Sequence, residues 1–340
     1  MTSKMFQESA STPSVIAEQL LKDEERYSDI GKFLQKNRPS FIATIARGSS
    51  DHACNYGAYM IAAKTGVPAI SLPPSLVTLY RAPLKMSNAM AIGVSQSGKS
   101  PDIVATMEAC AKEGAKTIAF ANIEDSPLAK LANTVFPLHA GPELSVAATK
   151  TFIASMVALA RFVGHWNNEQ ALLDALKDLP EKLERAQKAD LDTVANLLLK
   201  KNCALVLGRG PTWSIALEAA LKLKETCSLQ AEAFSSAEIK HGPKALIKNG
   251  YPIVMFAARG ESQSDVLDTA KEMRDSGAEV CLIATENIQG ANLVIPCPKD
   301  PWLDPIVMIQ FFHLAVERLA QKLGMNPDAP PHLNKVTLTV

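Results

Sequence analysis

The amino-acid sequence predicts an α/β protein made of two similar domains in tandem, each a parallel β-sheet with helices on both faces. Along the 340 residues, short apolar runs alternate with longer helical patterns, and the runs are continuously apolar. Strands buried on both faces of a parallel sheet have this composition, and helices cross between successive strands. A weak internal repeat accounts for the second domain.

The short apolar runs are the predicted strands. They are Phe41–Ala46, Ala91–Val94, Thr117–Ala121, Thr134–Leu138, Ala204–Leu207, Ile253–Ala257, Val280–Ala284 and Leu293–Ile295. Helical patterns are expected near residues 14–34, 51–65, 101–113, 145–164, 170–200, 213–228, 264–276 and 304–323. This order of elements is typical of α/β layers.

The repeat is seen where the first strand of each half ends. Ala46-Arg47-Gly48 and Gly208-Arg209-Gly210 stand at equivalent places, an offset of 209 − 47 = 162 residues. The same offset pairs Ala58 with Ala220, Val67 with Leu229 and Ala69 with Ala231. The predicted organisation is an N-terminal helical segment (1–35), a first domain (36–168), a charged helical connector (169–200), a second domain (201–330) and a C-terminal tail (331–340).

Composition excludes several classes of function. Lys plus Arg and Asp plus Glu both number 35, so the net charge is zero, and a general attraction to nucleic acid or anionic lipid is not expected. No apolar run reaches the roughly 18 residues of a membrane span. The polar start Met1–Val15 lacks the apolar core of a signal peptide. We expect a cytoplasmic protein.

The cysteines point the same way. No C-x-x-C pair is present, and most cysteines lie in apolar stretches, as expected for reduced core thiols in a cytosolic protein. They are Cys54, Cys110, Cys203, Cys227, Cys281 and Cys297. Because no His, Cys or Asp cluster shows metal-ligand spacing, neither a metal nor a cofactor is predicted.

A serine-rich turn, Val94–Asp102, follows a predicted strand and opens a helix. Pro101 suits the first helical position, Ser100 the N-cap and Asp102 the first turn. Hydroxyls and backbone N–H groups at a helix N-terminus can hold a phosphate, and Lys99 could add charge. An ordinary strand-to-helix turn is the alternative.

A second polar loop, Arg47–Asp51, follows the first strand. Ligands of open α/β sheets lie outside the carboxyl ends of the strands, so Ser50 and Ser95–Ser100 could face one pocket. Neither loop has the glycine pattern of a nucleotide site.

In the second half, Lys222 and Glu225 are three residues apart on one helix face, and Glu238–Pro243 contains His241. A carboxylate and a histidine are the usual proton carriers at neutral pH. The alternative is a solvated helix face followed by a capped turn. The remaining histidines, His52, His139, His165, His313 and His332, lie in no motif.

These motifs together resemble tandem sugar isomerase (SIS) domains, and in particular the isomerase domain of the glucosamine-6-phosphate synthase family, from about residue 36 to Val340. The resemblance implies a flavodoxin-like three-layer α/β/α sandwich for each domain. It rests on Ser95–Gly98, Ala140–Glu143 with Thr149-Lys150, Leu207–Gly210, Ala216–Glu218 with Leu221–Glu225, Ala231–Ala233, Glu238–Pro243 and Leu333–Thr337.

The resemblance implies a binding role for one set of residues. The sugar phosphate would be held by Ser50, Ser95, Gln96, Ser97 and Ser100. Val146 would offer its backbone to the sugar hydroxyls. The implied ligand is a hexose phosphate, either glucosamine 6-phosphate or fructose 6-phosphate.

The resemblance implies catalytic roles for another set. Glu225 would move a proton between C1 and C2, with Lys222 beside it. His241 would help to open the ring, by family analogy from the neighbouring subunit of a homodimer. Lys335, in a tail over the active site, would reach the sugar carbonyl, with a Schiff base as one option.

The sequence also departs from the family. Lys99 replaces a glutamate and Ala148 a serine, and Ala258–Glu261 stands where a second serine turn would be, so one phosphate site per chain is expected. Only 35 residues precede the first predicted domain, so we expect no glutaminase domain and no efficient synthesis from glutamine.

The sequence therefore favours glucosamine-6-phosphate deaminase, because Glu225, His241 and Lys335 are all retained. An aldose–ketose phosphosugar isomerase is the first alternative. A non-catalytic sugar-phosphate sensor is the second.

Overall fold

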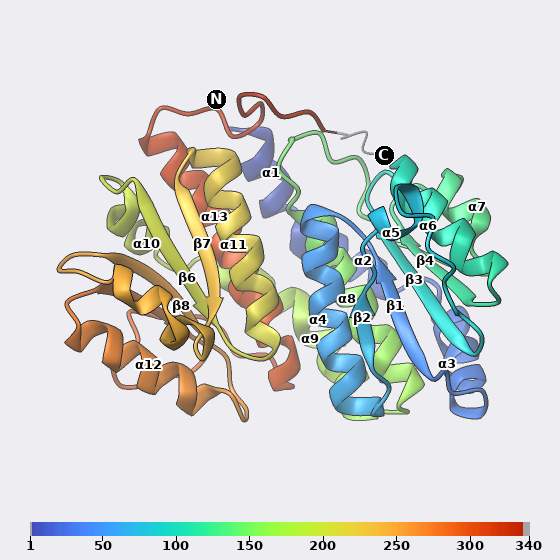
Figure 1. The fold of residues 1–340 in the computed structure, drawn as a ribbon. Coiled ribbons are helices and arrows are strands. Elements are labelled where there is room, and N and C mark those ends of the chain that lie inside the picture. Colours follow the sequence, from blue (N-terminus) through green and yellow to red (C-terminus); the bar gives the residue numbers. More distant parts are fainter. Residues whose placement is uncertain (1, 336–340) are drawn as a thin grey trace. The chain divides into compact units, whose positions relative to one another are not determined.

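The computed structural model describes residues 2–335, which form two five-stranded parallel sheets (Figure 1). Their strand orders are β2-β1-β3-β4-β5 and β10-β9-β8-β6-β7. Counted from the first strand of its own half, each sheet has the order 2-1-3-4-5 of flavodoxin-like folds. The predicted fold class, tandem parallel-sheet α/β sandwiches, is confirmed.

One compact unit contains the first sheet and comprises Ser14–Glu143, Lys150–Lys177 and the chain from Asn334. Its strands are β1 (Phe41–Ile45), β2 (Ala69–Ser71), β3 (Ala89–Ser95), β4 (Lys116–Ala121) and β5 (Thr134–Pro137). Its helices are α3 (Glu24–Lys36), α4 (Gly48–Thr65), α5 (Ser75–Thr78), α6 (Pro101–Lys112), α7 (Pro127–Leu131) and α8 (Lys150–Trp166). Ile103 and Met107 of α6 and Leu128 of α7 share one buried apolar cluster with strand residues.

The second compact unit comprises Met1–Pro13, Leu144–Thr149 and Asp178–Leu333. Its strands are β6 (Cys203–Gly208), β7 (Gln230–Ser235), β8 (Pro252–Ala257), β9 (Glu279–Ala284) and β10 (Leu293–Val294). Its helices are α1 (Lys4–Ala10), α10 (Leu191–Leu198), α11 (Pro211–Cys227), α12 (Gln263–Asp275) and α13 (Asp304–Lys322), with short 3₁₀ turns at Glu238–His241, Pro243–Leu246 and Pro301–Leu303. Two of the boundaries between the units fall inside helices, namely α2 (Thr12–Leu20) and α9 (Gln170–Ala186).

Each predicted strand overlaps a strand of the structure, but β2 and β7 were not predicted. Both lie at a sheet edge. An edge strand is not buried along its whole length, and the mixed sequence Gln230–Ser235 accordingly has only one buried residue. Continuous apolarity therefore identifies the central strands together with the edge strands β5 and β10, and it misses β2 and β7, which have only one buried residue between them.

Several helix predictions were wrong in their bounds. The expected helix at 14–34 is broken by Asp23, whose φ of 61° is left-handed. The expected helix at 170–200 is divided into α9 and α10, because the Asp190 side chain accepts the Asp192 N–H and starts a new helix. The helix expected from residue 145 begins at Lys150, and the short helices α1, α5 and α7 lie outside the predicted helical ranges.

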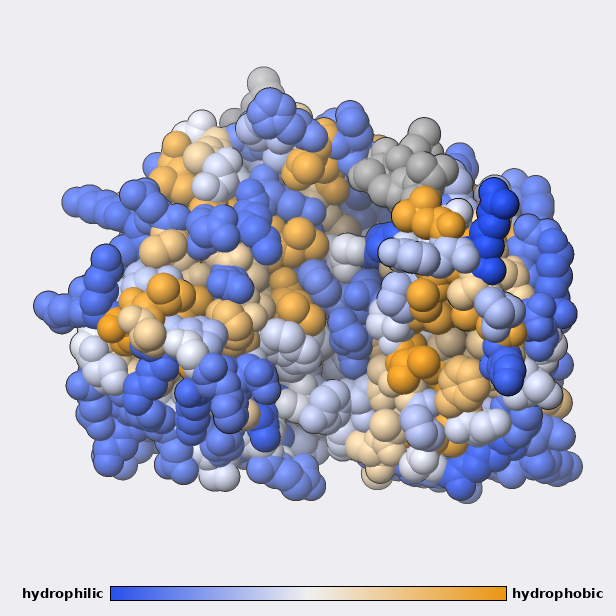
Figure 2. All heavy atoms as spheres, viewed as in Figure 1, coloured by the Kyte–Doolittle hydropathy of each residue, from blue (hydrophilic) through white to orange (hydrophobic). Residues whose placement is uncertain are grey.

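One face of the molecule is mainly hydrophilic. Hydrophilic residues predominate on the face drawn in Figure 2, and hydrophobic residues form separate patches between them. No helix in residues 2–335 is long and apolar enough to cross a membrane.

Candidate functional site

The candidate site is a cavity at the carboxyl ends of β1 and β3. These strands are parallel neighbours, and Ile45 pairs with Gly93 near their ends, so the loops that follow them lie side by side. The strand order reverses here, between β1 and β3, where open α/β sheets bind ligands. The cavity has a volume of about 360 Å³ and is lined by Arg47, Gly48, Ser50, Val94, Ser95, Gln96, Ser97, Ser100, Ile103 and Lys335.

The structure thus brings most of the predicted binding residues together. Ser50, the residues Ser95–Ser97 and Ser100 all line this cavity, and so does Lys335 from the chain end. Of the predicted tail at 331–340, residues 336–340 lie outside the described part of the chain. Val146 belongs to the other compact unit, where its N–H donates to the Asp328 carbonyl over 3.3 Å.

The serine turn is stabilised by hydrogen bonds from its own backbone N–H groups to two of its serine hydroxyls. The Ser95 hydroxyl accepts the Gly98 N–H at 2.9 Å, and the Ser97 hydroxyl accepts the Lys99 N–H at 3.3 Å. A hydroxyl that accepts can still donate its own hydrogen, so both serines keep a donor for a ligand. Ser100 is the N-cap of α6 but makes no capping hydrogen bond with its side chain.

Arg47 is a cavity residue to which sequence reasoning gave no role. Its Nε and Nη2 both lie 2.9 Å from Oδ2 of Asp102, in the first turn of α6. The Asp102 carboxylate is completely buried and also accepts the Ile103 N–H at 2.9 Å. The placement of Arg47 directly after the first strand was the available signal.

Glu143 is a second residue for which the sequence predicted no role of its own, although it belongs to the motif Ala140–Glu143. Its carboxylate is buried and accepts the Thr151 N–H at 3.1 Å and the Thr151 hydroxyl at 2.6 Å. Lys335 donates to the same carboxylate over 3.0 Å. The amine predicted to act on a sugar carbonyl is therefore paired with a fixed carboxylate.

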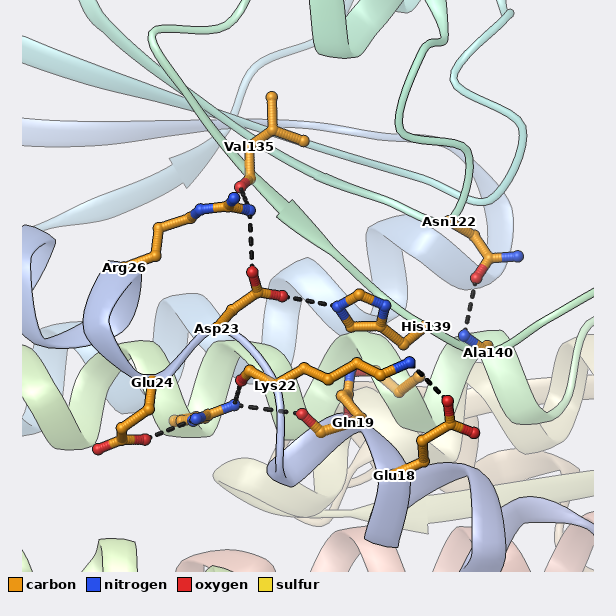
Figure 3. A network of polar contacts seen from close by, with 12 residues as sticks. Glu18, Gln19, Lys22, Asp23, Glu24, Arg26, Asn122, Val135, His139 and Ala140 are labelled. Atoms are coloured by element: carbon orange, nitrogen blue, oxygen red, sulfur yellow. Dashed lines mark hydrogen bonds and ion pairs between the residues drawn. The ribbon is translucent and has the colours of Figure 1, made fainter.

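The loop before Glu143 is held at its start by a polar network (Figure 3). His139, just after β5, bonds through Nε2 to Asp23 at 2.6 Å. Arg26 lies 3.2 Å from the same aspartate and donates to the Val135 carbonyl. Asp23 and His139 both have left-handed φ angles. His139 thus joins the helix pair α2–α3 to the end of β5.

The other unit contains a buried charged cluster on α11. Lys222 forms a short ion pair with Glu225 and lies 3.4 Å from Glu218, and His313 of α13 lies 3.8 Å from Glu218. Burial favours a neutral amine, but the two carboxylates outweigh it and raise the pKa of Lys222 above its ordinary value. Glu225 is the accessible end of the cluster, because its side chain is 20% exposed.

His241 is the remaining residue predicted to take part in catalysis. His241 is exposed at the end of a 3₁₀ turn, directly before Gly242 with its φ of 145°. Among the described residues, no group of three or more His, Cys, Asp and Glu side chains could hold a metal ion.

Comparison with known proteins places these features in a family. The SIS-domain model matches residues 36–163 and 197–289. The glutamine–fructose-6-phosphate aminotransferase of Thermus thermophilus is 32% identical over 334 residues, covering 93% of this chain and 55% of that protein. The chain therefore spans about half the length of the curated relatives it matches.

Several solved structures cover almost the whole chain, and two of them are at least 25% identical to it. A Silicibacter pomeroyi protein, provisionally assigned as a phosphosugar isomerase, is 37% identical with a TM-score of 0.90, covering 96% of this chain and all of that one. The C-terminal domain of glucosamine-fructose-6-phosphate aminotransferase from Francisella tularensis is 25% identical with a TM-score of 0.87, covering 97% and 98%.

Proposed function

The chain belongs to the SIS-domain family, and from this premise we propose that it is a phosphosugar enzyme that converts glucosamine 6-phosphate and water into fructose 6-phosphate and ammonia. The observation that carries the proposal is the cavity at the carboxyl ends of β1 and β3. It collects serine hydroxyls, the N-terminal ends of two helices and a lysine amine in one compact unit.

These groups suit the phosphate end of a hexose phosphate. Helix α4 begins at Gly48 and α6 at Pro101, and residues at or beside both starts line the cavity. Helix N-termini carry partial positive charge and outward N–H groups, which favour an anion. Ser95 and Ser97 are held rigidly enough by the turn to present their hydroxyls in fixed directions.

The groups proposed for the reaction are Glu225, Lys222, His241 and Lys335. His241 opens the sugar ring, Glu225 moves a proton from C2 to C1, and water adds to the resulting C2 imine and releases ammonia. The Lys222 ammonium forms ion pairs with the carboxylates of both Glu218 and Glu225. Lys335 stands ready to bind the open-chain carbonyl. As part of the proposal, the enzyme is a homodimer to which His241 contributes across the interface.

The test is steady-state release of ammonia and of fructose 6-phosphate from glucosamine 6-phosphate. We expect turnover by the wild type, loss of it in Glu225→Gln, and no effect of the control Glu184→Gln, an exposed α9 residue. Glucosamine without phosphate should be a poor substrate.

Other outcomes select the alternatives. Interconversion of aldose and ketose phosphates without ammonia release would identify an isomerase. Tight binding of hexose phosphates without turnover of any of them would identify a sensor. A wild type that binds no hexose phosphate would contradict all three functions.

A further inference from the structure

We propose that Arg47 is a direct phosphate ligand of the serine-lined cavity, and that Asp102 is the positioning residue that orients it. The inference deepens the proposed function and rests on it for the identity of the anion. It concerns residues of one compact unit only.

The first argument is the geometry of the guanidinium. Both contacts to Asp102 use the Nε and Nη2 side of the planar group, at 2.9 Å each. In a planar guanidinium, Nη1 points away from the edge formed by Nε and Nη2. The contact with Asp102 therefore fixes the side chain without using its whole set of five N–H donors.

The second argument is exposure. The Asp102 side chain is completely buried, whereas that of Arg47 is 49% exposed and lines the cavity. A pair made only to tie a loop to a helix would not need its cation to face a cavity beside the hydroxyls of Ser50 and Ser95. Arginine recognises phosphate well because its donors are arranged in a rigid fork.

The third argument is an internal comparison. The second half repeats the pair as Arg209 after β6 and Asp265 on α12, at offsets of 209 − 47 = 162 and 265 − 102 = 163 residues. There, Arg209 Nε lies 3.9 Å from Asp265, whose Oδ2 instead accepts a short hydrogen bond from Ser236. That half has Ala258–Glu261 where a serine turn would stand. The tight pair thus occurs in the half that has the serine turn.

The charge balance specifies what kind of contribution Arg47 makes. Asp102 cancels the net charge of Arg47, so the arginine adds directed hydrogen bonds more than attraction at long range. A lysine at position 47 would keep the charge but lose the fork. Loss of the Asp102 charge would leave an arginine that is still cationic but no longer oriented.

The experiment is calorimetric binding of inorganic phosphate and of glucosamine 6-phosphate at several salt concentrations. We expect Arg47→Gln to weaken both ligands by about tenfold or more, as for the loss of one charge-assisted hydrogen bond. Arg47→Lys should recover only part of the loss. Asp102→Asn should weaken binding and make it more sensitive to salt. The matched control Arg209→Gln should bind as the wild type does.

Thermal unfolding of each variant separates folding from binding. If Arg47→Gln does not fold, Arg47→Lys carries the test, since it keeps the charge beside Asp102. Wild-type affinity for phosphate in a folded Arg47 variant would overturn the proposal and leave the pair a structural tie. A rise in KM with little change in kcat is expected where turnover is measurable.

The outcomes also distinguish this inference from the proposed function. If phosphate binding depends on Arg47 but no ammonia is released, the inference stands and the deaminase proposal fails. If ammonia is released and Arg47→Gln binds normally, the deaminase proposal stands and the inference fails. A wild type that binds neither ligand overturns both.

Discussion

Gly98 shows how one residue shapes the candidate site. Its φ is +62°, and a Cβ there would lie 2.5 Å from the Cβ of Ser126, closer than side chains approach. Its carbonyl also accepts the Leu128 N–H at 3.1 Å. The close approach of the serine turn to α7 therefore requires glycine at this position.

We expect Gly98→Ala to destabilise the protein more than Gly114→Ala does. Both positions have left-handed φ, but a Cβ on Gly114 would meet nothing within 4 Å. The strain of about 1–2 kcal/mol is common to both, and the clash adds about 1–3 kcal/mol at Gly98 alone. Urea unfolding measures the difference, and phosphate binding should fall only in Gly98→Ala. Equal losses would show that the turn shifts freely.

Lys222 is the buried cation shared by Glu218 and Glu225. Lys222→Met leaves Glu218 and Glu225 without the cation they share, and we expect a loss of about 3–5 kcal/mol, as for other broken buried ion pairs. Lys177→Met, at an exposed ion pair, should cause no comparable loss.

The pKa of Lys222 fixes how this difference depends on pH. Because the folded pKa lies above the ordinary value of 10.5, the stabilisation is complete below that pH and is lost only as the pH rises through the folded pKa. The wild type and Lys222→Met should therefore differ by a constant amount from pH 7 to about 9, and the gap should narrow above about 10.5. A gap that already narrows between pH 7 and 9 would contradict the raised pKa.

Among the elements, the end of β5 depends on a contact distant in sequence. Asp23 breaks the predicted N-terminal helix and at the same place binds His139, 116 residues away. Both residues are left-handed, a conformation that costs energy and persists where surrounding contacts hold it. The contact between Asp23, at the break between α2 and α3, and His139 thus fixes the start of the loop that leads to Glu143.

A double-mutant cycle on Asp23→Asn and His139→Gln tests this anchor. Asparagine tolerates the left-handed backbone, so the change isolates the loss of charge. We expect each substitution to cost about 1–3 kcal/mol, and the pair to cost clearly less than their sum. Strict additivity, measured by urea unfolding, would show that the two side chains do not stabilise each other.

For the whole molecule, zero net charge means that attraction of an anion must be local. The chain carries 35 basic and 35 acidic residues, so the cavity's own donors and helix ends have to supply the affinity. The six cysteines, all of which lie in the described part of the chain, form no disulfide.

We expect reductant to leave the melting temperature unchanged and the four buried thiols to react only after unfolding. Burial raises the pKa of Cys110 and Cys227 to about 11 and that of Cys281 to about 12, and it also raises the pKa of Cys54. The partly exposed Cys203 and Cys297 should react first with a thiol reagent in the native protein. Rapid native labelling of the four buried thiols would contradict the packing described above.

The sequence by itself determined the central strands, the repeat and the serine turn, because each is encoded by neighbouring residues. A continuous apolar run such as Ile253–Ala257 specifies burial on both faces wherever the strand lies. Ser100 and Pro101 likewise specify a helix start through local backbone chemistry.

Only the tertiary structure decided which of these residues meet. Arg47 and Asp102 are 55 residues apart in the chain, and Glu143 and Lys335 are 192 apart. Such contacts depend on how strands are ordered and how loops close, which no short pattern records. The edge strands β2 and β7 escaped prediction because neither has the continuous burial that an apolar run records. The break at Asp23 escaped prediction because its partner His139 is 116 residues away.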